Sequence, residues 1–309
     1  MPLNLTHLAA FHAVAEAGSV TLGAERLLVS QPAVSKQVKL LEREVGAKLF
    51  DRTATGVRPT DAGRLLADYA RRIFSLAAEA EAAMSDQSGL RRGSLSVGAG
   101  PTLGTYLLPR ALVYFRQRFP AIRLHTEVAR AHLLRAALLD GAMDMAVTNA
   151  DVHWPDVEAR AFMTDELVAI APPSHPLARR RRVTPEQLCR EPFVVRETGS
   201  QTQSLVERTL AGHGHALDAV LALGSTEAVK EAVAEGLGVA MVSKLAVESD
   251  VARKRLAVLR VKGLSIRRPV YLLRARGRQE SKAAHAFGCI LKHAGRGTLP
   301  AARNPIRCP

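Results

Sequence analysis

The sequence contains few cysteines and no long hydrophobic run. Its 309 residues include three cysteines that are widely spread along the chain: Cys189, Cys289 and Cys308. An odd number at such spacing excludes a disulfide framework and any CxxC metal or redox motif. No apolar run approaches the ~18–20 residues that cross a bilayer, and the N-terminus has no basic segment followed by an apolar core. These absences predict a cytoplasmic protein with no membrane span.

Motifs of the common enzyme classes are also missing. The sequence has no GxSxG, HExxH, glycine-rich phosphate loop or paired-carboxylate motif. His213-Gly214-His215 is the nearest approach to a metal pair, and its composition is typical of a surface loop. Cys189 would suit a peroxide sensor only with a resolving thiol nearby, and the next cysteine in the sequence is Cys289. We therefore expect no catalytic residue, no metal site and no cofactor.

Acidic residues are too few to balance the basic ones. Lys and Arg number 43 against 29 Asp and Glu, which gives a net charge of +14. Residues 1–88 hold 10 basic and 10 acidic residues, so the whole surplus lies in residues 89–309. Part of it is the run Arg179–Arg182, and such runs are ordinarily solvated surface. Net charge alone therefore does not locate a DNA site.

Short apolar periodicities predict three helices near the N-terminus. The first repeats apolar residues at three-residue spacing and stops at Gly18, and Ser19 caps the second. Ser30 caps the third, which has Pro32 in its first turn and Gly46 at its end. Two short helices joined by a tight turn, the second of which opens with polar and basic residues, form a helix-turn-helix.

The third helix carries the residues expected to read DNA. An exposed first turn can enter the major groove, where glutamine and serine reach base edges and lysine reaches phosphate. These residues fall largely off its apolar stripe: Gln31, Ser35, Lys36 and Lys39. We expect Gln31, Pro32 and Ser35 to meet base edges, and the two lysines to meet phosphates. Residues 48–52 and 56–58 then read as the two strands of a wing.

A long helix is predicted from Thr60 to about Ser88. At about 1.5 Å per residue it is roughly 40 Å long, which is too long for one small core to cover. Its apolar and small residues recur in alternating steps of four and three, a heptad seam typical of helix pairing. Packing against its own domain is the alternative. We expect dimerisation through four residues of the seam: Leu66, Tyr69, Ile73 and Leu76.

From Gly93 onward, strand and helix patterns alternate. This alternation predicts an α/β fold with a parallel sheet and right-handed crossovers. At roughly 100–200 residues per domain, the length predicts two or three domains in all. Residues 296–309 are rich in Pro, Arg and Ala, which predicts a disordered tail.

These motifs resemble the LysR-type transcriptional regulators. The segment FHAVAEAGS is similar to the opening helix and turn of that family, and SQPAVSKQV to its recognition helix. The resemblance covers about residues 3–293. The wing tip, Ala54-Thr55-Gly56, lacks the basic residue that many members carry, so we expect Arg52 and Arg58 to make the wing contacts with phosphate. The matching segments are 11–19, 30–38, 60–63, 101–109, 115–120, 199–200 and 224–239.

The resemblance implies the organisation of the whole chain. Residues 1–60 would form a winged helix-turn-helix and residues 61–90 the linker and dimerisation helix. Residues 91–295 would form a two-lobed α/β effector domain like that of periplasmic binding proteins. Lobe 1 would comprise about residues 91–163 and 268–295, and lobe 2 about residues 164–267.

The resemblance also implies a function. The chain would bind double-stranded promoter DNA as a homodimer or homotetramer, and a small co-inducer between its lobes would modulate it. RNA polymerase is a candidate partner, and activation and repression both stay open. A free solute-binding receptor would share the second half but would need a signal peptide and no helix-turn-helix. Within the family, the segment Thr102–Pro109 is similar to that of regulators of carbon-fixation and sulfur-assimilation genes. This similarity does not identify the metabolite.

Local chemistry predicts that this co-inducer is an anion. Three segments open helices, and the first of them, Gly100-Pro101-Thr102, also ends a strand. Helix N-termini carry free N–H groups and a positive dipole end that suit carboxylate or phosphate. Simple helix capping is the alternative for the same side chains. Thr126 and Thr148, at strand ends, are further candidates. The expected effector contacts are Pro101, Thr102, Thr126, Thr148, Ser200, Thr202 and Ser225.

Overall fold

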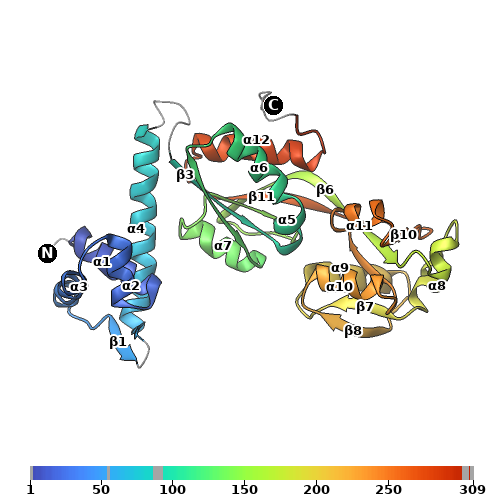
Figure 1. The fold of residues 1–309 in the computed structure, drawn as a ribbon, viewed down its shortest axis with the longest axis horizontal. Helices are drawn as coiled ribbons and strands as arrows, with labels where there is room; N and C mark the ends of the chain where they lie inside the picture. The colour runs from blue at the N-terminus through green and yellow to red at the C-terminus, as the bar shows by residue number, and fades with distance from the viewer. Residues whose placement is uncertain (1–2, 54–55, 86–92, 301–305, 307–309) are drawn as a thin grey trace. The chain divides into compact units, whose positions relative to one another are not determined.

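The computed structural model describes residues 3–53, 56–85, 93–300 and 306 (Figure 1). The chain forms two compact units: residues 1–89 with 137–142, and residues 90–136 with 143–309. None of the described helices is both long and apolar enough to span a membrane. Three predictions fall outside the described residues, namely those for 54–55, 86–88 and most of 296–309.

The first unit contains a winged helix-turn-helix, as the sequence predicts. Leu8 and Phe11 of the first helix share one fully buried core with Leu41 of the third. The two wing strands pair antiparallel. The elements of this unit are α1 (Leu5–Ala17), α2 (Val20–Leu27), α3 (Gln31–Val45), β1 (Phe50–Thr53), β2 (Gly56–Pro59) and α4 (Asp61–Ser85).

The helix ends follow the capping residues of the sequence, with one exception. Gly18 ends α1 in the left-handed conformation, at φ 63°. The Ser30 hydroxyl accepts a hydrogen bond from the Ala33 N–H and so caps α3. Ser19 precedes α2, but its side chain accepts no capping bond. Ser19 therefore occupies the predicted N-cap position, where its backbone carbonyl accepts the first helical bond from the Gly23 N–H, but the predicted side-chain cap does not form.

Gly56 holds the wing close to the turn that follows α1. Its backbone has φ 151°, and a side chain there would collide with the carbonyl oxygen of Gly18. The same oxygen accepts a hydrogen bond of 3.0 Å from the N–H of Val57. The wing therefore reaches this position only with glycine at residue 56.

We expect Gly56→Ala to destabilise the first unit by about 2–3 kcal/mol, because it adds a backbone collision to an unfavourable φ. Gly18→Ala is the matched control. Gly18 also has a positive φ, but no atom lies within 4 Å of an added Cβ. Its cost should be about 1 kcal/mol. Hydrogen exchange of the α1 and α3 amides in the full chain measures both losses, and equal losses would contradict the close approach.

The second unit is built on a seven-stranded sheet with the order β10-β6-β11-β5-β3-β4, in which β9 also pairs with β6. A separate two-stranded sheet joins β7 and β8. The strands are β3 (Gly93–Ala99), β4 (Ile122–Val128), β5 (Met145–Thr148), β6 (Val157–Ala171), β7 (Phe193–Arg196), β8 (Ala219–Leu223), β9 (Ala240–Ser243), β10 (Ala257–Leu259) and β11 (Ile266–Ala275).

The main sheet is mixed and not parallel throughout. β3 pairs in parallel with β4 and β5, as predicted. β6 and β11 instead run antiparallel to each other along the whole of β11, with one register shift between Val270 and Tyr271. The prediction of a parallel sheet is therefore wrong for this part. The reason is that the chain passes between two lobes twice, once in each direction, on these two long strands (Figure 1).

Two lobes with separate cores result. Phe115 and Phe287 are fully buried in the core of lobe 1, and Phe193 and Val229 in two clusters of lobe 2. The two-lobed α/β fold predicted from the sequence is confirmed. The helices of this unit are α5 (Pro101–Tyr106), α6 (Leu108–Arg118), α7 (Ala131–Leu139), η2 (Pro176–Arg179), α8 (Pro185–Cys189), α9 (Gln201–Gly212), α10 (Thr226–Ala234), η3 (Lys244–Ala246), α11 (Glu248–Ala252) and α12 (Lys282–Gly295).

Candidate functional site

Helix α3 presents a polar face to solvent. Its apolar stripe is buried against the core of the first unit: Val34, Val38 and Leu41. On the other side Gln31, Pro32, Lys36 and Lys39 are exposed and Ser35 is half-buried. The first two turns of α3 thus offer amide, hydroxyl and ammonium groups on one accessible surface, which is what base and phosphate contacts in a major groove require.

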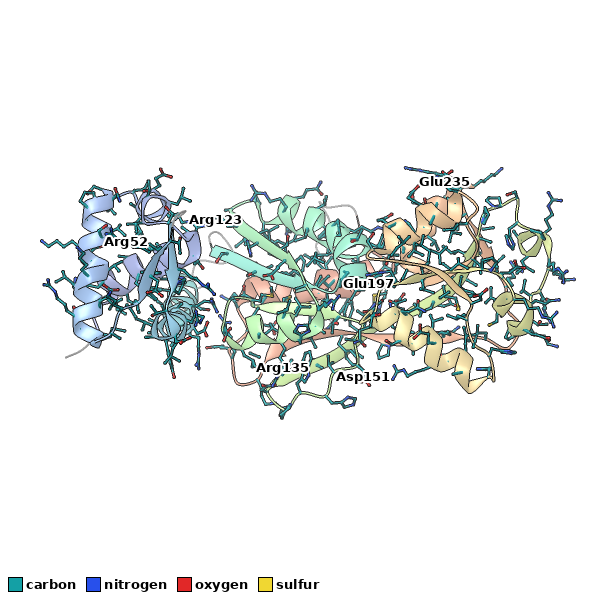
Figure 2. All side chains as sticks on the ribbon, turned by 90° about the horizontal axis from the view of Figure 1, so that it is seen from below. Arg52, Arg123, Arg135, Asp151, Glu197 and Glu235 are labelled. Carbon is teal, nitrogen blue, oxygen red and sulfur yellow. The ribbon has the colours of Figure 1, made fainter. Side chains whose placement is uncertain are left out.

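The wing adds two further cations. Arg52 lies on β1 (Figure 2) and Arg58 on β2, and both are exposed. Like Lys36 and Lys39, these two arginines form no side-chain ion pair or hydrogen bond with another described residue. Their charges are free to meet phosphates, and we keep all seven predicted DNA contacts as proposals.

The four residues of the predicted dimer seam lie on two different faces of α4. Leu66 and Ile73 are half-buried and pack on the core of their own domain, which was the alternative for this helix. Tyr69 and Leu76 are 53% and 66% exposed. Leu65, which the sequence reading missed, is 62% exposed and completes the apolar face with them. A periodic pattern cannot separate these faces when both are apolar.

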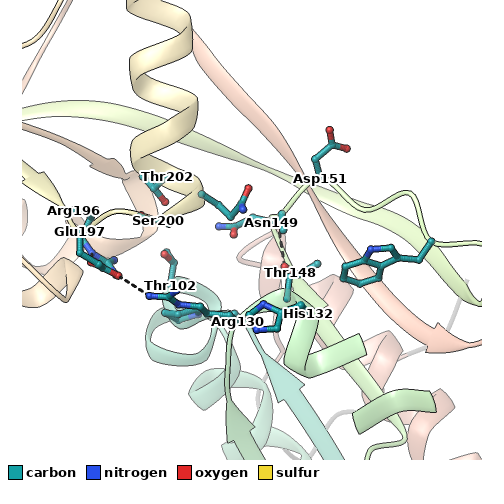
Figure 3. Close-up of a pocket in the computed structure, with 17 residues that line it drawn as sticks. Thr102, Arg130, His132, Thr148, Asn149, Asp151, Arg196, Glu197, Ser200 and Thr202 are labelled. Atoms are coloured by element: carbon teal, nitrogen blue, oxygen red, sulfur yellow. Dashed lines mark hydrogen bonds and ion pairs between the residues drawn. The ribbon is translucent and has the colours of Figure 1, made fainter. Parts of the chain in front are cut away.

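A cavity of about 280 Å³ lies between the lobes of the second unit. It is lined where strands β3, β4, β5 and β7 end, the edge at which α/β folds ordinarily bind ligands. Figure 3 shows Ser200 and Thr202 at the start of α9, with Thr102 of α5 and Thr148 of β5 nearby. Five of the seven predicted effector contacts line it: Pro101, Thr102, Thr148, Ser200 and Thr202.

The other two predicted contacts do not line this cavity. Thr126 lies exposed on β4, where it pairs in register with Val97. Ser225 caps α10, because its hydroxyl accepts a hydrogen bond of 3.1 Å from the N–H of Ala228. The Ser225 side chain is therefore a helix cap, which was the alternative to ligand contact.

The five lining residues differ in what their side chains already bind. Thr148 accepts a hydrogen bond from Ala150 N–H at 3.1 Å, and Ser200 accepts one from Gln203 N–H at 3.4 Å. Thr102 is buried, and its hydroxyl makes no hydrogen bond with the described residues. Helix α5 also lacks a side-chain cap. Thr102 and the first N–H groups of α5 are therefore open to a ligand.

Charged groups of both lobes meet in the cavity. Arg196 is buried and donates two hydrogen bonds to the carboxylate of Glu197, from Nε to Oε2 at 2.8 Å and from Nη2 to Oε1 at 3.0 Å. This contact holds the pKa of the Glu197 carboxyl below its usual range. Arg196 also donates to the Thr226 hydroxyl and the Gly224 carbonyl, so its donors are largely committed within lobe 2. It acts as a fixed part of the wall.

Arg130 and His132 supply cations that the sequence reading missed. Arg130 is 57% exposed and lies 3.8 Å from Glu197, as the dashed line in Figure 3 shows. Its guanidinium also approaches the backbone at Gly199. His132 is exposed, and Asp151 is the other carboxylate of the lining (Figure 2). The signal that could have found Arg130 is its position just after β4, at the same sheet edge as Thr102 and Thr148.

The described residues contain no group of His, Cys, Asp and Glu side chains that could hold a metal ion. Cys189 is half-buried, and burial raises the pKa of its thiol. A peroxide-reactive cysteine needs the opposite, a lowered pKa and good exposure.

Fold and surfaces together define a regulator with a DNA-binding domain and a ligand-binding domain. Residues 5–64 match the bacterial regulatory helix-turn-helix of the lysR family, and residues 88–296 match the LysR substrate binding domain. The chain belongs to the LysR family of transcriptional regulators.

Three proteins illustrate what this chain is similar to. The RuBisCO operon transcriptional regulator of Allochromatium vinosum is 39% identical over 93% of this chain and 95% of its own. A full-length OxyR point variant of Pseudomonas aeruginosa has the same fold, with a TM-score of 0.74 at 24% identity over 98% of this chain and 97% of its own. The Synechocystis PCC6803 CcmR regulatory domain in complex with 2-PG is 28% identical over 67% and 98%, with a TM-score of 0.59. The curated relatives are named as transcriptional regulators, so this chain is a DNA-binding regulator and not an enzyme.

Proposed function

We propose that the chain is a sequence-specific regulator of promoter DNA that responds to a small anionic metabolite. It reads base edges with Gln31, Pro32 and Ser35 of α3. Lys36 and Lys39, with Arg52 and Arg58 of the wing, bind phosphates. The exposed polar face of α3 supports this assignment. A target among RuBisCO genes is supported by the Allochromatium vinosum relative. Such a regulator works in the cytoplasm, where promoter DNA lies.

The regulator acts as a homodimer or as a homotetramer built from dimers. Two copies pair through the exposed apolar face of α4: Leu65, Tyr69 and Leu76. Exposed apolar residues gathered on one helix face mark an interaction site. A symmetric dimer presents two copies of α3 to a pseudo-palindromic operator. RNA polymerase is a further candidate partner.

The interlobe cavity holds the effector. The observation that carries this assignment is the meeting of open α5 N–H groups, the Thr102 hydroxyl and Arg130 at one space of about 280 Å³. Positive ends of helices and an accessible guanidinium together favour a phosphate or carboxylate. The 2-PG held by the CcmR regulatory domain supports an anion of this size. Closure of the lobes on the ligand then changes the geometry bound to DNA.

Calorimetry of the full chain with 2-PG and, separately, with inorganic phosphate tests the effector site. We expect Thr102→Val and Arg130→Ala each to lower the affinity about tenfold, which is ~1.4 kcal/mol. Thr126→Val is the matched control, because it makes the same chemical change on an exposed strand residue outside the cavity. If wild type binds neither anion, or if both cavity variants bind like wild type, the assignment is wrong.

A further inference from the structure

A second cavity of about 290 Å³ lies between helix α9 and strand β11. Helix α9 contributes three residues at positions that face one side: Gln201, Leu205 and Arg208. Strand β11 contributes Arg267, Arg268, Pro269 and Tyr271. The cavity is therefore bounded by a lobe 2 helix and by one of the two strands that pass between the lobes.

The second cavity is separate from the effector cavity but shares a wall with it. Residues 149–151 and Gln201 line both spaces. The effector cavity alone contains Thr102, Arg130 and Ser200, and the second cavity alone contains the arginines of α9 and β11. One hydrogen bond joins the two, since Arg268 Nη1 donates to the Thr202 hydroxyl at 3.1 Å.

Cations dominate the second cavity. The side chains of Arg208 and Arg267 are exposed, and neither forms an ion pair with another described residue. Within the described part of the chain, Arg208 donates one side-chain hydrogen bond, from Nε to the Ser204 carbonyl, at 3.3 Å. The carboxylate of the lining is Asp151, which lies 3.1 Å from His153. Two guanidinium groups without a carboxylate partner are a natural receptor for phosphate or carboxylate.

Arg268 forms the inner wall of the cavity and is already neutralised within the protein. It is 5% exposed, its Nε donates to Asp165 at 2.9 Å, and its Nη2 lies 2.8 Å from the same carboxylate. The charges that a ligand in the cavity would meet are therefore those of Arg208 and Arg267.

We propose that the second cavity binds a small anionic metabolite independently of the effector cavity. Arg208 and Arg267 bind its phosphate or carboxylate group. Leu205, Pro269 and Tyr271 contact its carbon skeleton. This proposal extends the proposed function, which places one anion in the effector cavity, to a second anion beside it.

Equilibrium dialysis of the full chain against ³²P-labelled inorganic phosphate tests the second site. At near-physiological salt we expect wild type to bind about two equivalents per chain, and Arg208→Ala/Arg267→Ala to bind about one, because only the second site loses its guanidinium groups. Arg179→Ala/Arg253→Ala is the matched control. It removes the same charge from exposed arginines of lobe 2 that line neither cavity, and it should keep both equivalents.

Thr102→Val/Arg130→Ala separates this proposal from the proposed effector site. If both assignments are right, this variant loses the equivalent of phosphate that Arg208→Ala/Arg267→Ala keeps. If Arg208→Ala/Arg267→Ala binds phosphate like wild type, the second site does not exist, whatever happens at the effector cavity. If that variant loses one equivalent while Thr102→Val/Arg130→Ala loses none, the second site stands and the effector assignment fails.

Discussion

Lys36→Glu/Lys39→Glu should lower operator affinity by about 100-fold or more, because each substitution replaces a cation that we propose to bind phosphate with a charge that phosphate repels. Both ammonium groups are exposed on α3 and form no ion pair with a described residue, so the change should leave the fold intact. The single variants Lys36→Ala and Lys39→Ala should each reduce the salt dependence of binding by about one unit of slope. Gel-shift titrations at several salt concentrations measure both quantities.

Lys254→Glu/Lys262→Glu is the control for this experiment. It changes the net charge equally, on two exposed lysines of lobe 2. Its affinity for the operator should stay within a few-fold of wild type. If the control loses as much affinity as the α3 variant, overall charge and not α3 explains the binding.

Gln31→Ala should act differently, because a base contact carries sequence information and a phosphate contact does not. We expect it to relax the preference at one base pair of each half-site, at a cost of about 1–3 kcal/mol against the preferred base. Ser35→Ala should do the same at a neighbouring position. Competition with operators that carry single base changes measures the effect. A uniform loss across all sequences would contradict base readout.

Tyr69→Asp/Leu76→Asp should convert the protein towards monomers and weaken operator binding sharply. Both side chains are more than half exposed in the single chain, so the substitutions should be tolerated in the monomer. In a dimer they would bury unpaired carboxylates in an apolar contact, at a cost of several kcal/mol (~2–7 for each buried polar group). Loss of the dimer removes one of the two half-site contacts.

Two further variants sharpen this test. Leu237→Asp introduces one carboxylate at a leucine that is 47% exposed in lobe 2, and it should sediment like wild type. Ile73→Asp instead places the charge against the core of the first unit, so its main effect should be loss of stability. Sedimentation velocity and hydrogen exchange distinguish these outcomes. If Tyr69→Asp/Leu76→Asp sediments like wild type, the exposed face of α4 is not the dimer contact.

The residues that could be predicted from the sequence are those whose role is local. Ser30 caps α3 through the N–H of a residue three positions away, and the apolar stripe of α3 fixes its polar face. Thr102 and Ser200 open helices after strands, so their place at the sheet edge follows from alternation alone. The order of the helices, the wing and the two lobes also follow from local patterns in the sequence.

The residues that were missed depend on distant parts of the chain. The position of Arg130 just after β4 places it at the sheet edge, but its contact with Glu197 and its approach to Gly199 depend on residues of the other lobe that are distant in the sequence. Leu66 and Tyr69 look alike in a heptad, but the domain core covers the first and leaves the second exposed. The mixed sheet was missed because the antiparallel pairing of β6 and β11 joins residues about 100 positions apart.

Selection of bound sequences from a random DNA library by the full chain tests the central claim most directly, because it needs no knowledge of the target promoter. The account predicts one enriched pseudo-palindromic motif, with half-sites separated by one or more turns of roughly 10 base pairs. Lys36→Glu/Lys39→Glu should recover no motif, and 2-PG or phosphate should alter the affinity or footprint on the selected DNA. Recovery of unrelated sequences by wild type, or of the same motif by the α3 variant, would contradict the account.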